Sequence, residues 1–171
     1  MFRIATLVLL GTLASAPALA AKDPCKGVSV KKDSFGTTRA LDAGALKLRK
    51  TGDKWSMQIE FDAGGGYGGF VGMNAQALPP GTKVEVMLED GSIVALESAS
   101  SAAAISATIM GVTSIKYQVP FAPTDDQLKA LTAQPLKAAR VVNDAEKPLA
   151  NEFSNGDIKK FQEVATCMLS T

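Results

Sequence analysis

The stretch Lys54–Asp62, KWSMQIEFD, has the most regular pattern in the chain. Its four apolar residues, Trp55, Met57, Ile59 and Phe61, occupy every second position, and polar or charged residues lie between them. Alternation with a period of two is typical of a β-strand that buries one face and exposes the other to water. The stretch therefore predicts a half-buried strand.

The segment just before this strand, Leu46–Arg49, alternates in the same way. A two-residue turn at Thr51-Gly52 would join the two segments as a hairpin and set Leu48 beside Trp55. The sequence thus predicts two adjacent antiparallel strands whose apolar side chains share one face.

A second hairpin is predicted over residues 82–97, TKVEVMLEDGSIVALE. A two-residue turn at Asp90-Gly91 would pair Val84 with Glu97 and break the apolar face. A three-residue loop, residues 89–91, pairs Val84 with Leu96 instead and keeps the apolar residues together. We therefore expect the second register.

The remaining segments predict further strands followed by helices. The capping-box residues Thr124 and Gln127 open a short helix that ends before Pro135, and a final helix begins near Ser154. Further strands are expected through residues 28–30, 105–110, 112–119 and 138–142. This order predicts an α+β fold, in which the short helix and the C-terminal helix pack on one face of an antiparallel sheet.

Residues 1–20, MFRIATLVLLGTLASAPALA, have the layout of a secretory signal peptide. Arg3 precedes a short apolar run, and Ala18-Leu19-Ala20 provides small residues for cleavage after Ala20. We therefore expect residues 21–171 to form a single α+β domain that is exported to the periplasm or secreted.

The charge of the chain is close to balanced, with 18 basic and 17 acidic residues. Nucleic-acid binding needs an excess of cations, so none is expected here. No segment after the first twenty residues is long and apolar enough to predict a membrane span.

Two cysteines, Cys25 and Cys167, lie near opposite ends of the expected mature chain. In an exported protein two cysteines usually pair, so a disulfide is predicted. The alternative is a reactive or metal-binding thiol, which the absence of histidine disfavours. We expect no metal and no cofactor.

The glycine-rich stretch at residues 62–72, DAGGGYGGFVG, contains the spacing G-x-G-x-x-G at Gly64, Gly66 and Gly69. In a dinucleotide-binding fold this motif is followed by a helix. Here the next residues include Gly72 and then Pro79-Pro80, so no such helix is predicted. We expect a loop or a β-bulge instead.

Three large apolar residues, Tyr67, Phe70 and Met73, accompany these glycines. They are candidates for binding a small apolar ligand or a partner such as an envelope protein. The alternative is that they fold back onto the sheet as core residues.

No recognisable catalytic motif is present, since the chain has no histidine for a Ser-His-Asp triad or a Cys-His pair. Glu60 faces away from Trp55 in the predicted strand and is expected at the surface. We therefore expect a non-enzymatic binding or protein-interaction module. The alternative is a small histidine-independent hydrolase that uses carboxylates or a serine.

Three short motifs resemble segments of uncharacterised small exported bacterial proteins. They are KKDSFG at residues 31–36, LEDGS at residues 88–92 and LKALTAQPLKAARV at residues 128–141. The resemblance implies an exported α+β domain and carries over no catalytic or binding residue.

Overall fold

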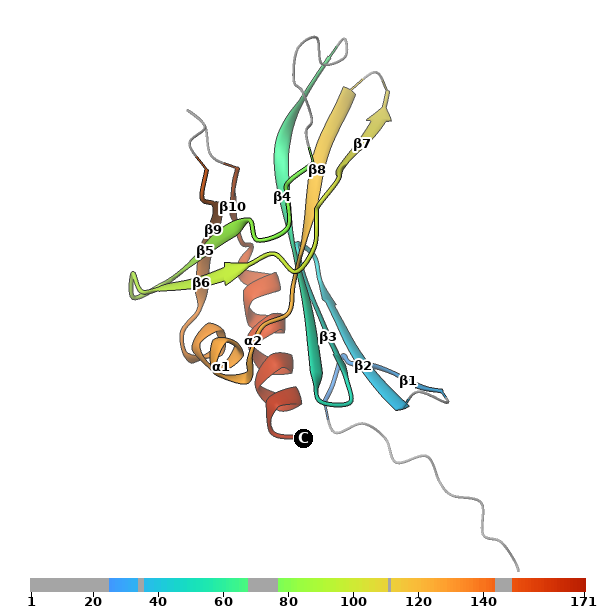
Figure 1. The fold of residues 1–171 in the computed structure, drawn as a ribbon, viewed down its shortest axis with the longest axis vertical. Helices are drawn as coiled ribbons and strands as arrows, with labels where there is room; N and C mark the ends of the chain where they lie inside the picture. The colour runs from blue at the N-terminus through green and yellow to red at the C-terminus, as the bar shows by residue number, and fades with distance from the viewer. Residues whose placement is uncertain (1–24, 34–35, 68–76, 111, 144–148) are drawn as a thin grey trace, which may run out of the picture.

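Lys54–Tyr67 forms β4, a long strand near the middle of the larger of two antiparallel sheets (Figure 1). The computed structural model describes residues 25–33, 36–67, 77–110, 112–143 and 149–171. The four alternating apolar side chains of β4 are buried: Trp55 is 7% exposed, and Met57, Ile59 and Phe61 are fully covered. The period-two pattern thus identified the buried face of this strand.

The larger sheet has the strand order β1-β2-β3-β4-β8-β7, and every pairing in it is antiparallel. Around β4 its strands are β1 (Ser29–Asp33), β2 (Gly36–Ala43), β3 (Leu46–Thr51), β7 (Ala104–Ile109) and β8 (Val112–Phe121). In the larger sheet, β4, β7 and β8 extend beyond the helices and form a projecting arm at one end of the molecule (Figure 1). We call residues 62–67, 104–110 and 112–116 the arm.

The hairpin between β3 and β4 has a different register from the one predicted. Leu48 lies opposite Met57, and Trp55 lies opposite Lys50, because the turn is Gly52-Asp53 and not Thr51-Gly52. Gly52 has a φ of +56°, a conformation that glycine adopts without steric cost at the first position of such a turn. The shift is two residues along the strand, so each side chain stays on its predicted face.

The smaller sheet has the order β10-β9-β5-β6, also antiparallel throughout. Its strands are β5 (Lys83–Leu88), β6 (Ile93–Glu97), β9 (Leu136–Val141) and β10 (Ala150–Glu152). Val84 pairs with Leu96 and Val86 with Val94, which confirms the predicted three-residue loop.

The two sheets meet where β6 ends. Ser98 forms a bridge with Phe121 at the end of β8, and the amide of Ala99 donates to the carbonyl of Pro120 at 2.8 Å. On the other side, the Asn151 side chain in β10 donates to the carbonyl of Glu60 in β4 at 3.0 Å. Backbone and side-chain hydrogen bonds thus link the two sheets where their ends meet.

Two helices complete the fold, α1 (Asp125–Ala133) and α2 (Asn155–Leu169). The capping box of Thr124 and Gln127 is present, and the Ser154 hydroxyl caps α2. Helix α2 packs against β2, β3 and α1. No helix in the described ranges has the length and apolar character needed to cross a membrane. An α+β fold of mainly antiparallel strands is thus confirmed, with the strands divided between two sheets.

Hydrogen bonds tie both helices to the larger sheet. The indole N–H of Trp55 donates to the Asp125 carboxylate at 2.6 Å, which links β4 to α1. The Lys50 ammonium lies 4.9 Å from the centre of the Trp55 ring and donates to the carbonyl of Met168 at 3.1 Å. A cation is favourable at this C-terminal end of α2, where the helix dipole is negative.

Cys25 and Cys167 form the expected disulfide, with Cα atoms 5.7 Å apart. Their separation along the chain is 142 residues, so the bond joins the start of the described chain to the last helix. Buried side chains from both sheets and both helices, including Phe61, Phe121 and Phe161, form one hydrophobic cluster.

Candidate functional site

The first residues to locate are the three apolar candidates of the glycine-rich stretch. Tyr67 is the last residue of β4, where its backbone pairs with Val112 of β8. Phe70 and Met73 lie outside the described residues. The strand register therefore brings the start of this stretch to the end of the arm, beside the β7–β8 hairpin.

The glycines before Tyr67 lie within β4 and do not form a phosphate-binding loop. Gly65 pairs with Ser114 and Gly66 with Thr113, after a register shift that marks a β-bulge. At the bulge, Gly64 has a φ of +98°, and its amide donates to the Asp62 carboxylate at 2.8 Å. This part of the stretch matches the predicted β-bulge, after which Gly65 and Gly66 pair with β8.

The arm carries three large apolar side chains that are exposed to solvent. Ile105 is 50% exposed, Ile109 is 71% exposed and Met110 is 95% exposed. Ile105 and Ile109 share one face of β7, because they are four residues apart in a strand. These three residues are half of the large apolar side chains exposed in the described part of the chain. Their clustering at one end of the molecule marks a candidate binding surface.

β7 is also an edge strand, because among the described strands it pairs only with β8. Its sequence, AISATI, contains no charged residue and no proline. The outer side of an edge strand presents unpaired N–H and C=O groups that can pair with another chain. We call β7 together with Met110 the open edge.

The other sheet edges are protected in ways that the open edge is not. β1 carries adjacent lysines, Lys31 and Lys32, and β10 is only three residues long. Along β6, the Gln127 side chain donates to the carbonyl of Ala95 at 3.1 Å. Charged side chains, a very short strand or a covering segment usually prevent an edge strand from pairing with another chain. Within the described structure, β7 has none of these protections.

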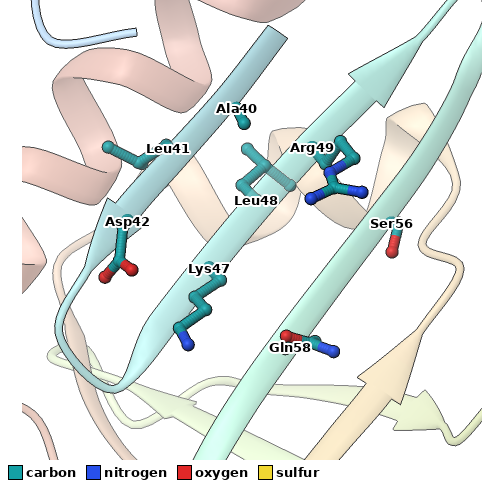
Figure 2. Close-up of a pocket in the computed structure, with 8 residues that line it drawn as sticks. All are labelled: Ala40, Leu41, Asp42, Lys47, Leu48, Arg49, Ser56 and Gln58. Atoms are coloured by element: carbon teal, nitrogen blue, oxygen red, sulfur yellow. The ribbon is translucent and has the colours of Figure 1, made fainter. Parts of the chain in front are cut away.

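A polar hollow of about 220 Å³ lies on the outer face of β2, β3 and β4 (Figure 2). Figure 2 shows the side chains of Lys47, Arg49, Ser56 and Gln58 on this face, with Asp42 at its margin. Arg49 forms no ion pair or side-chain hydrogen bond with a described residue. The hollow can hold a small anion or a carboxylate, but it is smaller than most ligand pockets.

An apolar hollow of about 280 Å³ lies on the outer face of the smaller sheet. Met87, Ile93 and Ala138 line it, together with Arg140 and Glu85, which form an ion pair at 2.7 Å. It is also just below the usual size of a ligand pocket. Neither hollow combines apolar walls with several convergent polar groups, the arrangement that marks most small-molecule sites.

The best-defined charged contact of the larger sheet involves Glu60. Its carboxylate accepts from the Lys116 ammonium at 2.7 Å and from the Gln118 amide at 3.3 Å. The hydrogen bond from Lys116 is the main reason that the pKa of Glu60 is lowered from its ordinary value. A general acid needs the opposite shift, so this geometry favours an ion pair on the sheet surface over an acid catalyst. No group of three or more metal-ligating side chains occurs among the described residues.

The replacement Glu60→Gln is expected to lower the free energy of unfolding at pH 7 by about 0.5 kcal/mol, since the ion pair is partly exposed. Because the pKa of Glu60 is lower in the folded state, the stabilisation is present above the ordinary value of 4.5. It is lost as the pH falls from there through the folded pKa. Urea titrations of both proteins between pH 7 and pH 3 should show the difference shrinking. An equal difference at every pH would contradict the prediction, and Glu163→Gln serves as the control.

Comparisons with known proteins add no evidence on the function of this chain. No protein family model, no curated protein and no solved structure matches the chain.

Sequence reasoning missed Ile105, Ile109 and Met110 as candidate binding residues. It predicted a strand over this segment but treated its isoleucines as ordinary strand residues. The available signal was the stretch from Ser98 to Met110, which contains no charged residue and yet includes two isoleucines and a methionine. A strand without any charge on either face is unusual at the edge of a sheet.

Proposed function

We propose that the protein is a non-enzymatic protein-interaction module that binds its partner through the open edge. The single observation that carries this proposal is the exposure of Ile105 and Ile109 on an edge strand, and of Met110 directly after it, where the strand has no charge and no described residue covers its outer side. Backbone pairing along β7 would supply affinity, and the exposed apolar side chains would supply specificity.

The remainder of the fold fits the role of a rigid support for the arm. Helix α2 packs against β2 and β3 of the larger sheet, and the indole of Trp55 in β4 donates to Asp125 of α1. β4 and β8 run from this core into the arm, so the open edge is held by strands anchored in buried residues such as Phe61 and Tyr117.

The proposal retains Tyr67, Phe70 and Met73 as partner-contacting residues. The chain leaves β4 at Tyr67, whose backbone pairs with Val112, and Val112 pairs in turn with Ile109. The backbone of Tyr67 therefore lies one strand away from β7 at the same end of the sheet.

We also propose that the protein acts after export, in the periplasm or outside the cell, with residues 1–20 removed after Ala20. The disulfide between Cys25 and Cys167 supports this location, since such bonds persist in oxidising compartments.

The test is site-specific photo-crosslinking in the cells that make the protein. A photoreactive residue at position 109 is expected to give a covalent adduct with one defined protein. The same residue in place of Val30, an exposed apolar side chain on edge strand β1, is the matched control and should give none. Failure to obtain an adduct at positions 105, 109 and 110 would overturn the proposal.

A further inference from the structure

We propose that the partner of the open edge is a second copy of the same chain, which pairs with it strand to strand across a two-fold axis. This inference rests on the proposed function and names the partner of the same surface. In the pair, β7 of each copy runs antiparallel to β7 of the other, so the larger sheets join into one continuous sheet.

The first argument is the direction of the backbone groups. Ile109 pairs with Val112, and only Met110 and Gly111 lie between them. The residues that close a two-residue hairpin exchange hydrogen bonds, and bonding alternates along the strand. Ile109, Ala107 and Ile105 therefore bond to β8, whereas the N–H and C=O groups of Ser106 and Thr108 point outward.

The second argument is the pattern of side chains. Residues 105–109, ISATI, have the same order of side-chain types in either direction along the strand. An isoleucine stands at each end, a residue with a hydroxyl group stands next to each isoleucine, and alanine is in the middle. A two-fold interface brings the same surface together from both copies and so needs a self-complementary pattern. With Ala107 on the axis, each Ile105 faces Ile109 of the other copy, and each Ser106 faces Thr108.

This register also provides hydrogen-bond partners for the backbone groups of β7 that point outward. Ser106 and Thr108 are the residues whose groups point outward, and with Ala107 on the axis they face each other across the interface. They would exchange hydrogen bonds in both halves of the pair. Backbone geometry and side-chain pattern thus select the same register independently.

The third argument is charge. Pairing a strand with its own copy places like charges close together unless the strand is neutral, and β7 has no charged residue. The same pairing through β1 would bring Lys31 and Lys32 close to their own copies. The whole chain has a net charge of only +1, so long-range repulsion between copies is small.

The register can be tested with single cysteines in the mature chain, whose own two cysteines form a disulfide. In the proposed pair the two Ala107 Cα atoms lie at a non-hydrogen-bonded position, about 4.5 Å apart, which is within the range of a disulfide. The variant Ala107→Cys is therefore expected to form a covalent dimer under mild oxidation. Ser106→Cys is the matched control, because its two copies would be about 8 Å apart and out of reach.

Sedimentation velocity over a concentration series tests the association itself. The wild type is expected to reach twice the monomer mass, and Ala107→Lys should weaken the dimer at least about tenfold, since like charges meet on the axis. Val30→Lys places the same charge on edge strand β1 and should leave the dimer unchanged. A mixture of Ala107→Lys and Ala107→Glu should restore dimers.

The outcomes separate this inference from the proposed function. A wild type that stays monomeric at every concentration overturns the self-pairing, as does a dimer that Ala107→Lys leaves intact. Equal cross-linking of Ala107→Cys and Ser106→Cys also overturns it. If the photoreactive residue at position 109 captures only a different protein, self-pairing fails and the proposed function stands. If no adduct forms at positions 105, 109 and 110, the proposed function fails as well.

Discussion

Replacing both Cys25 and Cys167 with serine is expected to lower the free energy of unfolding by about 5 kcal/mol. The disulfide closes a loop across 142 residues of sequence, so it restricts the unfolded chain strongly. A loss of this size is comparable to the whole stability of many small domains. Urea denaturation followed by the fluorescence of Trp55, the single tryptophan, would measure it.

Two controls accompany this experiment. Reduction of the wild type should cause a similar loss, and the reductant should not affect the double-serine variant. A thiol-reactive probe should label no cysteine in the unfolded, unreduced wild type. A loss below about 1 kcal/mol would show that the bond does not constrain the unfolded chain as the chain-entropy model requires.

The replacement Phe161→Ala is expected to cost about 3–5 kcal/mol of unfolding free energy. Phe161 is fully buried in α2, and it belongs to the cluster that joins both sheets and both helices. Truncation removes apolar contacts and leaves a cavity that the surrounding side chains only partly fill.

The matched control for this variant is Glu163→Ala, an exposed position on the same helix that changes helix propensity without creating a cavity. Its unfolding free energy should stay within about 0.5 kcal/mol of the wild type. A similar loss in both variants would mean that α2 is destabilised as a helix, and that packing of the Phe161 ring is not the cause.

Much of the fold could be predicted because local patterns and tertiary packing favour the same structure. The alternation in Lys54–Asp62 identified the buried face of β4, and the three-residue loop of the second hairpin followed from keeping one apolar face intact. The cap at Thr124 depends only on side chains within one turn of helix. In each case the deciding interactions lie close together in the sequence.

Features that depend on distant contacts were harder to predict. The arrangement of two sheets depends on contacts between residues far apart in the sequence, such as the bridge between Ser98 and Phe121 that links the sheets where they meet. The β3–β4 register was wrong by two residues, because two turns preserve the same faces and only the conformation of Gly52 distinguishes them.

The candidate site was only partly accessible from the sequence for the same reason. Tyr67 was selected from its glycine-rich context, and the register places its backbone beside the β7–β8 hairpin. The exposure of Ile105 and Ile109 depends on which strand occupies the edge of the sheet, and this order is a property of the whole fold. An alternating segment looks the same in sequence whether its neighbour is present or absent.

The last helix ends at the opposite end of the molecule from the arm (Figure 1). A surface linker attached after Thr171 would therefore orient every immobilised molecule with its arm toward the solution. In a symmetric pair joined at the arms, the two C-termini would point away from each other, and cargo fused there would be held at the two far ends. The protein would then act as a spacer of fixed length between whatever its two ends carry.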